Sequence, residues 1–247
     1  MKLYTELAEW WQLFSPAEEY RDEAASFLRL IRDNCAAPCR TLVEFGAGAG
    51  SNALHRKEHF ALTLVDLSPE MLAVSRALNP ECEHITGDMR HVRLGRIFDA
   101  VFIHDSIMYM TSEDDLRQAI ETAYLHCAPG GVAVIAPDHV RETFQPSTEH
   151  GGADGDGGDE RSMRWLMWSF DPDPRDTTFE THFAFLLREG ERVRVEHDRH
   201  VEGLFAREAW LRLLTEAGFL PEIVTDLYGR EVFVARKPGG TADEAMR

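Results

Sequence analysis

Three carboxylates and a run of glycines occupy the places where strands are expected to end, and these residues could hold a polar ligand. Glu44, Asp66 and Asp88 each follow or close a short apolar stretch, and Glu44 leads directly into Gly46-Ala-Gly-Ala-Gly50. Open α/β sheets bind ligands at the carboxyl ends of their parallel strands. The glycines allow a tight turn, and the free N–H groups of the following helix start can bind a carboxylate or phosphate. The pattern therefore predicts a ligand site along one sheet edge.

The three acids suggest parts of one ligand. Asp66 lies about half a β-α-β unit beyond the glycine turn, at the position of an acceptor for ribose hydroxyls. Asp88 can accept a hydrogen bond from an exocyclic amine while the thioether of Met89 packs on a purine. A buried Glu44 is costly unless a partner satisfies it, and a cationic or hydroxyl-rich ligand is one such partner. We expect a ligand with a purine, a ribose and a further polar group.

Two cofactors fit this description. A dinucleotide site prefers the spacing GxGxxG and no acid beside the negative pyrophosphate. Here the third glycine comes one residue early, in Gly46-Ala-Gly48-Ala-Gly50-Ser51, and Glu44 precedes the turn. A sulfonium nucleoside with an α-amino acid tail suits these residues better than an NAD(P) dinucleotide does.

Strands alternating with helices must position these residues. We expect strands at 41–45, 61–66, 83–85, 98–104 and 132–136, with helices at 52–58, 68–78 and 113–127 between them. This alternation indicates a parallel sheet covered on both faces. A further helix over 206–217 and a closing hairpin, 222–226 with 231–235, complete the expected domain.

Residues 140–201 break the alternation. Three stretches, 163–170, 178–187 and 192–201, alternate polar and apolar residues with period 2 and predict an inserted antiparallel sheet. In the middle stretch the face of Phe179 to Phe185 lies opposite Glu180 and His182. The glycine-aspartate run 150–159 is expected to be a mobile loop.

The N-terminal segment predicts two helices. Leu3 to Phe14 shows helical spacing, and Ser15-Pro-Ala-Glu18 reads as a capping box that starts a second helix ending near Asn34. The aromatic residues here are either core or the rings of a lid over a ligand.

Composition excludes several classes of function. The chain has 26 Lys and Arg against 43 Asp and Glu, a net charge of −17, which disfavours binding to nucleic acid or an anionic membrane. We expect no signal peptide and no transmembrane helix. The four cysteines lack a zinc spacing, so we expect reduced thiols, no metal site and a cytoplasmic protein.

Together these stretches resemble the class I S-adenosylmethionine-dependent methyltransferases. The resemblance is carried by Val43 to Gly50, Val65-Asp-Leu-Ser-Pro-Glu-Met-Leu72, Gly87-Asp-Met89, the strand 98–104 and Pro129-Gly-Gly131. It implies a Rossmann-like, doubly wound, seven-stranded, mostly parallel α/β sheet with an antiparallel terminal hairpin. It also implies S-adenosylmethionine as cofactor, contacted by Glu44, Gly46, Ala47, Gly48, Asp66, Leu67, Met71, Asp88, Met89 and His104.

Other segments resemble a narrower group. Tyr4-Thr-Glu-Leu-Ala8 is similar to the opening of small-molecule methyltransferases, which adds Tyr4 to the cofactor contacts. The stretch from His200 to Trp210 looks like the region after the inserted sheet in amino-sugar N-methyltransferases. We expect four regions: a helical lid (1–34), a cofactor-binding domain (35–139 and 202–237), a substrate cap (140–201) and a disordered tail (238–247).

The resemblance implies in-line methyl transfer to an N or O atom of a small-molecule acceptor by a monomer or homodimer. Candidates near the methyl position are His104, Asp105, Tyr109, His182 and His200; we assign His104, His200 and His182 to catalysis, with structural roles as the simpler alternative. Arg161, Arg164 and Arg207 could bind a phosphate or carboxylate of the acceptor. An NAD(P)-dependent oxidoreductase and a non-catalytic cofactor-binding protein are the rival interpretations.

Overall fold

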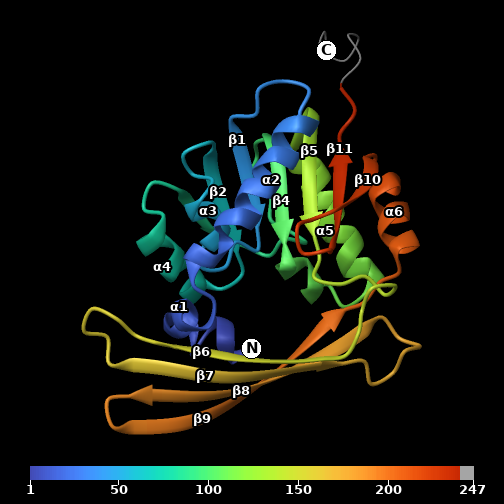
Figure 1. The fold of residues 1–247 in the computed structure, drawn as a ribbon. Helices are drawn as coiled ribbons and strands as arrows, with labels where there is room; N and C mark the ends of the chain where they lie inside the picture. The colour runs from blue at the N-terminus through green and yellow to red at the C-terminus, as the bar shows by residue number, and fades with distance from the viewer. Residues whose placement is uncertain (240–247) are drawn as a thin grey trace.

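Short runs rich in Val, Ile, Leu and Phe form the strands of a central seven-stranded sheet (Figure 1). In this computed structural model, which describes residues 1–239, the spatial order is β10-β11-β5-β4-β1-β2-β3. Strands β1 to β5 run parallel, and β11 is antiparallel to β5 and to β10. The strands are β1 Thr41–Phe45, β2 Ala61–Asp66, β3 Glu83–Thr86, β4 Phe98–His104, β5 Cys127–Ala136, β10 Leu220–Thr225 and β11 Glu231–Arg236. The expected fold class is confirmed.

Helices cover both faces of this sheet. Alternate residues of each strand point to opposite faces, so the core divides into two layers. One layer packs against α2 and α3, and the other against α5 and α6. The α-helices are α1 Trp11–Phe14, α2 Arg21–Asn34, α3 Ser51–Leu54, α4 Pro69–Leu78, α5 Glu113–His126 and α6 Arg207–Glu216. Ser68 and Ser112 cap α4 and α5 by accepting hydrogen bonds from the N–H groups of Met71 and Asp115.

A second, four-stranded antiparallel sheet lies across the carboxyl ends of the parallel strands (Figure 1). Its strands, in spatial order, are β6 Ser147–Asp154, β7 Arg161–Phe170, β8 Thr178–Glu189 and β9 Arg192–Gly203. The inserted sheet is confirmed, and the shared face of Phe179, Phe183 and Phe185 is buried as expected.

One expectation for this sheet is wrong. Residues 150–154 belong to the edge strand β6, which pairs with β7, and only the turn from Gly155 onward is a loop. A Cβ at Gly151 would lie 2.6 Å from the ring of Trp165. Glycine here lets the strand backbone pass directly over the indole, a tertiary contact that composition does not reveal.

The N-terminal segment also differs from expectation. Instead of one amphipathic helix it forms short pieces: the 3₁₀-helices η1 Lys2–Tyr4 and η2 Ala8–Trp10, then α1. Its apolar side chains pack mainly on the inner face of the small sheet, while the Tyr4 carbonyl accepts a hydrogen bond from Ser68 Oγ at 2.5 Å. The segment contacts both the small sheet and Ser68, which lie in different directions. A single straight helix could not make both sets of contacts, so the segment is broken into short helical turns.

The capping box does not form either. Ser15 Oγ hydrogen-bonds with the Tyr20 hydroxyl at 2.7 Å, and the Ala17 N–H donates to Gln12 Oε1 at 3.1 Å. The second helix therefore begins as the 3₁₀-helix η3 Ala17–Tyr20 and continues as α2, which ends at Asn34 as expected. Of the expected C-terminal tail, residues 240–247 lie outside the described part of the chain. Within residues 1–239, no helix combines the length and apolar character needed to cross a membrane.

A buried ion pair lies under the glycine turn between β1 and α3. Arg56 Nη2 donates to Glu44 Oε2 at 2.8 Å, and the two side chains are 0% and 3% exposed. The guanidinium carbon lies 3.9 Å from the ring centroid of Phe102. Burial raises the pKa of Glu44 and lowers the pKa of Arg56, so each charge persists only because the other opposes that cost.

Replacing Arg56 should therefore destabilise the fold. Arg56→Met leaves Glu44 buried without a cation and should lower the free energy of unfolding by about 3–5 kcal/mol. The double variant Glu44→Gln/Arg56→Met should recover most of that loss. Urea denaturation measures both. Arg96→Met is the control, because Arg96 also lies over a phenyl ring but is 47% exposed; it should cost less than about 1 kcal/mol. Equal losses for the two single variants would contradict the argument.

Candidate functional site

The predicted acids and glycines meet at the carboxyl edge of the large sheet. The N–H groups of Gly46 and Ala47 donate to the carbonyl of Val65 on β2, at 2.7 and 3.0 Å. Asp66, at the end of β2, accepts from the Gly48 N–H at 2.7 Å and from the Ser68 N–H at 2.8 Å. Burial raises the pKa of Asp66, and these N–H bonds partly oppose that shift. Asp66 thus fixes the turn and retains lone pairs for a ligand.

The glycine turn has an open side. Gly48 has φ +53°, and a Cβ built there would meet only the terminal methyl of Met71, at 3.6 Å. Met71 itself is fully buried behind the turn, whereas Leu67, next to Asp66, is 67% exposed. An exposed leucine beside a half-buried carboxylate offers an apolar surface for a flat ring, and the contact of Leu67 with a cofactor remains a prediction.

Asp88 and Met89 lie on the other side of the turn. Both oxygens of Asp88 accept hydrogen bonds from the Arg90 guanidinium, which also donates to Asp115 at 2.6 Å. Arg90 lowers the pKa of Asp88, so this carboxylate is ionised and already paired. The Met89 methyl would lie 3.0 Å from a Cβ on Gly46, which places its thioether against the turn.

Glu44 requires a correction. Its expected partner was a cationic or hydroxyl-rich ligand, but its carboxylate is paired with Arg56 inside the protein. The signal for this pair lay in the sequence, because Arg56 follows shortly after the glycine turn, two residues beyond the end of α3. The carboxylate therefore needs no ligand to offset its burial, and any contact of Glu44 with a cofactor remains a prediction.

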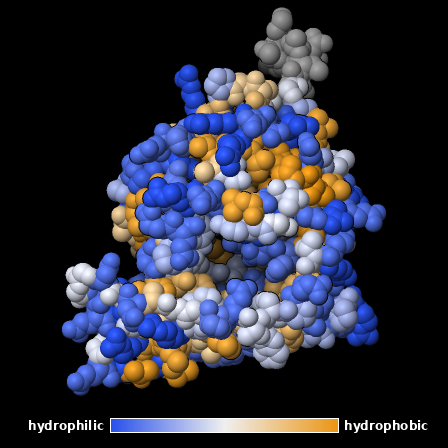
Figure 2. Space-filling model, in the orientation of Figure 1, coloured by the Kyte–Doolittle hydropathy of each residue, from blue (hydrophilic) through white to orange (hydrophobic). Residues whose placement is uncertain are grey.

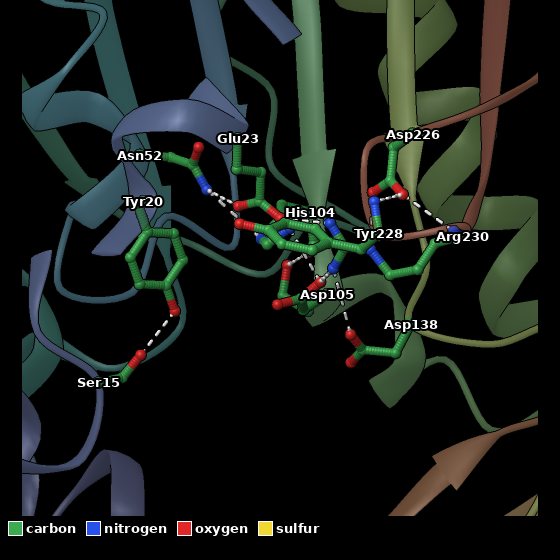
Figure 3. A network of polar contacts seen from close by, with 11 residues as sticks. Ser15, Tyr20, Glu23, Asn52, His104, Asp105, Asp138, Asp226, Tyr228 and Arg230 are labelled. Atoms are coloured by element: carbon green, nitrogen blue, oxygen red, sulfur yellow. Dashed lines mark hydrogen bonds and ion pairs between the residues drawn. The ribbon is translucent and has the colours of Figure 1, made fainter. Parts of the chain in front are cut away.

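His104 ends β4 at the centre of a polar network (Figure 3). Its Nε2 lies 3.2 Å from Glu23 Oε1 and 3.0 Å from Asp105 Oδ1, and its Nδ1 lies 3.5 Å from Asn52 Nδ2. Burial lowers the pKa of His104, but Asp105 and Glu23 outweigh burial and the net shift is upward. His104 is held by two carboxylates that favour its protonated form, which suits a positioning role better than that of a free base.

Arg230 joins this network from the loop before β11. Its guanidinium pairs with Glu23, with Asp226 at 2.8 Å, with Asp105 at 3.4 Å and with Asp138 at 3.6 Å. Burial alone would raise the pKa of Glu23, yet His104 and Arg230 hold it at about 2. The network borders a cavity of about 230 Å³. Its walls are formed by Ser15, Glu19, Tyr20, Glu23, His104, Asp105, Tyr228 and Arg230.

Sequence reasoning did not identify Glu23, Asp138 or Arg230. Glu23 gave a usable signal, because it falls on the same helix face as Tyr20 and Phe27, within an otherwise apolar stripe. Asp138 and Arg230 lie in loops after β5 and before β11, where no periodic pattern marks them. Figure 2 shows the molecule hollowed between the large-sheet part and the small sheet, the region that these residues face.

A chain of hydrogen bonds closes the N-terminal segment over this region. The Tyr4 and Tyr109 hydroxyls are 2.6 Å apart, and Tyr109 donates to His200 Nδ1 at 2.8 Å. His200 Nε2 lies 3.0 Å from Asp198 Oδ2, which also accepts from the Leu3 N–H at 2.8 Å. Burial lowers the pKa of His200 although Asp198 opposes the shift. The neutral imidazole, 1% exposed, therefore orients Tyr109 and fixes Tyr4.

His182 does not reach the site. It lies on the outer face of the small sheet, stacked on Phe170 and His197 and paired with Glu180 at 2.9 Å. Its assignment to catalysis is wrong because alternate residues of β8 face opposite ways, and the inner face belongs to Thr181 and Phe183.

The three arginines proposed for the acceptor also have other partners. Arg161 is paired with Asp159, Arg164 with Asp154 and Arg207 with Glu231, each at the surface. They are not brought together, so they form no common anion site.

The chain is similar to known methyltransferases over most of its length. A family model for a methyltransferase domain matches residues 42–131. The dTDP-3-amino-3,4,6-trideoxy-α-D-glucopyranose N,N-dimethyltransferase of Streptomyces venezuelae is 30% identical over 220 residues, which span 88% of this chain and 91% of that protein. The dTDP-3-amino-3,6-dideoxy-α-D-glucopyranose N,N-dimethyltransferase of Streptomyces fradiae is 29% identical and covers 89% of this chain and 86% of its own length.

Solved structures agree with these relatives. The sugar N-methyltransferase KedS8 of Streptoalloteichus superposes with a TM-score of 0.80 at 29% identity, covering 89% of this chain and 88% of that one. CalS10, an amino pentose methyltransferase of Micromonospora echinaspora with bound S-adenosylmethionine, gives a TM-score of 0.77 at 26% identity over 88% of this chain and 91% of that one. This chain belongs to the S-adenosylmethionine-dependent methyltransferases. The dinucleotide alternative is thereby ruled out.

The residues of this methyltransferase fit its cofactor. The open side of Gly48, the carboxylate of Asp66 and the exposed Leu67 form one continuous edge suited to a nucleoside. In the first turn of α3, Ser51 Oγ and Asn52 Oδ1 are buried and have no hydrogen-bond partner among the described residues. Polar groups of an amino acid tail could satisfy them.

Asp66 gives a direct test of this edge. Asp66→Ala should weaken binding of S-adenosylhomocysteine by about 1–3 kcal/mol, because it removes a charged acceptor and loosens the Gly48 N–H. Isothermal titration calorimetry measures the change. Glu70→Ala, an exposed acid on the next helix, is the control and should bind normally. Unchanged affinity in Asp66→Ala would remove Asp66 from the site.

Asp198 gives a test of the closed N-terminal segment. Asp198→Ala removes the acceptor for the Leu3 N–H and for His200, so hydrogen exchange across residues 3–10 should quicken about 10- to 100-fold, equivalent to about 1–3 kcal/mol. Mass-spectrometric exchange measures this. Asp173→Ala, which changes an exposed turn pair with Arg175, should leave these amides unchanged. Exchange equal to the wild type in Asp198→Ala would show that the bond does not hold the segment.

Proposed function

We propose that this protein transfers a methyl group from S-adenosylmethionine to the amino nitrogen of a small amino sugar. The observation that carries this proposal is the excess of carboxylates at the carboxyl end of β4. Four carboxylates, those of Glu23, Asp105, Asp138 and Asp226, surround one arginine, Arg230, and one histidine. Burial raises the pKa of Asp105, yet the other three carboxylates still outnumber the two cationic side chains. Such a surplus of negative charge attracts a protonated amine and gives no advantage to a neutral hydroxyl. The amino-sugar substrates in the names of the relatives support the same acceptor.

Residues of this chain would hold the two reactants in place. Gly48, Asp66 and Leu67 would bind the cofactor, which supplies an electrophilic methyl group when bound. The carboxylates around Arg230 would orient the acceptor, and Tyr4 with Tyr109 would close the site from the N-terminal side. Orientation of two reactants alone can lower a barrier by roughly 7–11 kcal/mol. The closed segment also excludes water from the reacting atoms.

The acceptor can be tested with matched pairs of sugars. Incubation with methyl-labelled S-adenosylmethionine should label dTDP-3-amino-3,6-dideoxy-α-D-glucopyranose or the free 3-amino sugar, and not their 3-hydroxy counterparts. Mass spectrometry locates the added methyl groups on nitrogen. Preferential labelling of the hydroxy sugars would overturn the choice of nitrogen. Binding of S-adenosylhomocysteine without turnover of any sugar would overturn the amino-sugar proposal and favour the non-catalytic alternative.

A further inference from the structure

Glu202 is a carboxylate on the inner face of the small sheet, outside the network of Glu23, His104 and Arg230. It lies on β9 with Asp198 and His200, and the alternation of the strand turns all three toward the large sheet. Its position is closely fixed. A Cβ at the next residue, Gly203, would lie 2.2 Å from the Met110 carbonyl oxygen, so the end of β9 presses against the segment that follows η4 Asp105–Tyr109.

One oxygen of Glu202 is held by a row of hydroxyls. Ser169 on β7 donates to Thr181 on β8 at 3.0 Å, and Thr181 donates to Glu202 Oε2 at 2.6 Å. The row crosses an inner face that is otherwise mostly aromatic. Among residues 1–239 no donor reaches the other oxygen, Oε1. The carboxylate is thus oriented through one oxygen while the second remains available.

The charge on Glu202 distinguishes it from its neighbours. Glu23, Asp105 and Asp138 pair with Arg230 or His104, whereas Glu202 makes no ion pair within the described chain. Burial, with a contribution from the charge of Asp138, raises the pKa of Glu202 to about 7. Glu202 lies two residues beyond His200 on the same face of β9, and His200 Nδ1 is 2.8 Å from the Tyr109 hydroxyl, which is 2.6 Å from that of Tyr4. The carboxylate therefore lies near the two phenols, and burial raises the pKa of both.

We propose that Glu202 accepts the proton of the acceptor ammonium, which frees the nitrogen lone pair for methyl transfer; this inference rests on the proposed function. The N–H bond breaks and its proton joins a Glu202 oxygen. The amine nitrogen then forms a bond to the methyl carbon, and the electron pair of the broken carbon–sulfur bond stays on the thioether leaving group. Glu202 releases its proton to solvent before the next turnover. A carboxylate matched to neutral pH suits this exchange with an ammonium of pKa about 8.

Other titratable groups face this carboxylate and belong in any account of its pH dependence. Asp138 and His139 lie after β5, Asp105 and Tyr109 belong to η4, Tyr4 comes from the N-terminal segment and His200 from β9. Burial lowers the pKa of both His139 and His200, and burial raises the pKa of both tyrosines. Burial, with the charge of Asp138, also raises the pKa of Asp105, but that carboxyl is paired with His104 and Arg230. Glu202 is the carboxyl of this set that has a pKa of about 7 and no ion-pair partner among the described residues.

The decisive variant is Glu202→Gln, which keeps the shape and removes the proton acceptor. With the amino sugar that the acceptor assay identifies, its kcat should fall about 100-fold near pH 7, and the deficit should shrink to a few-fold near pH 9, where the amine is already neutral. The matched control is Glu180→Gln, the same change on the outer face of β8, which should keep wild-type kcat. An unchanged kcat, or an equal deficit at both pH values, would overturn the proposal.

Two further measurements test the role of Glu202 independently of the kcat of Glu202→Gln. Thr181→Val removes the hydrogen bond that lowers the pKa of Glu202, so the acid limb of the wild-type pH–rate profile should move to higher pH; an unmoved limb contradicts the proposal. Difference infrared titration of the protein without acceptor should show a carboxyl band near pH 7 that Glu202→Gln lacks. Absence of that band overturns the role of Glu202 alone, whereas failure of every amine in the acceptor assay overturns the proposed function.

Discussion

The Asp198 carboxylate makes the hydrogen bonds that hold the N-terminal segment and the small sheet over the carboxyl edge of the large sheet. It accepts from the Leu3 N–H and bonds His200, which orients Tyr109 at the end of the parallel sheet. Three parts of the chain that are far apart in sequence therefore meet through one buried acid and one neutral imidazole. A parallel sheet leaves its carboxyl edge open, and in this molecule the N-terminal segment and the small sheet cover that edge because these bonds hold them together.

Charge compensation divides the acids of the site into two kinds. Glu44 and Glu23 are buried beside arginines, and in each case the arginine favours the charged carboxylate against the cost of burial. Glu202 is oriented by a hydroxyl and lacks a cation within the described chain, so its charge depends on pH. Both kinds make the region negative, but only the second can exchange a proton during turnover. The difference between Glu23 and Glu202 thus follows from the cation beside the first and the lack of one beside the second among the described residues.

The sheet and its cofactor edge could be predicted because their signals are local. Asp66 ends an apolar run and accepts a hydrogen bond from the glycine turn, and Ser68 caps the helix that follows. The N-terminal helix and the glycine-aspartate loop could not be predicted in the same way. The Leu3 N–H donates to Asp198, which is distant along the chain, and Gly151 passes over Trp165, which only the sheet brings opposite it.

The candidate catalytic histidines could likewise be predicted only in part. Period 2 already placed His200 on one face of the predicted strand 192–201 and His182 on the face opposite Phe183, yet alternation alone does not say which face turns inward. The observed strand β9 continues to Gly203, so the same alternation places Glu202 beside His200. The aromatic row of Phe179, Phe183 and Phe185 answers that question, since burial of that row forces His182 outward and, through the register of β8 with β9, turns His200 inward. The buried row of phenylalanines on β8 thus shows which residues of the paired strand β9 point into the site. Glu202, which pairs with Phe179, is one of them.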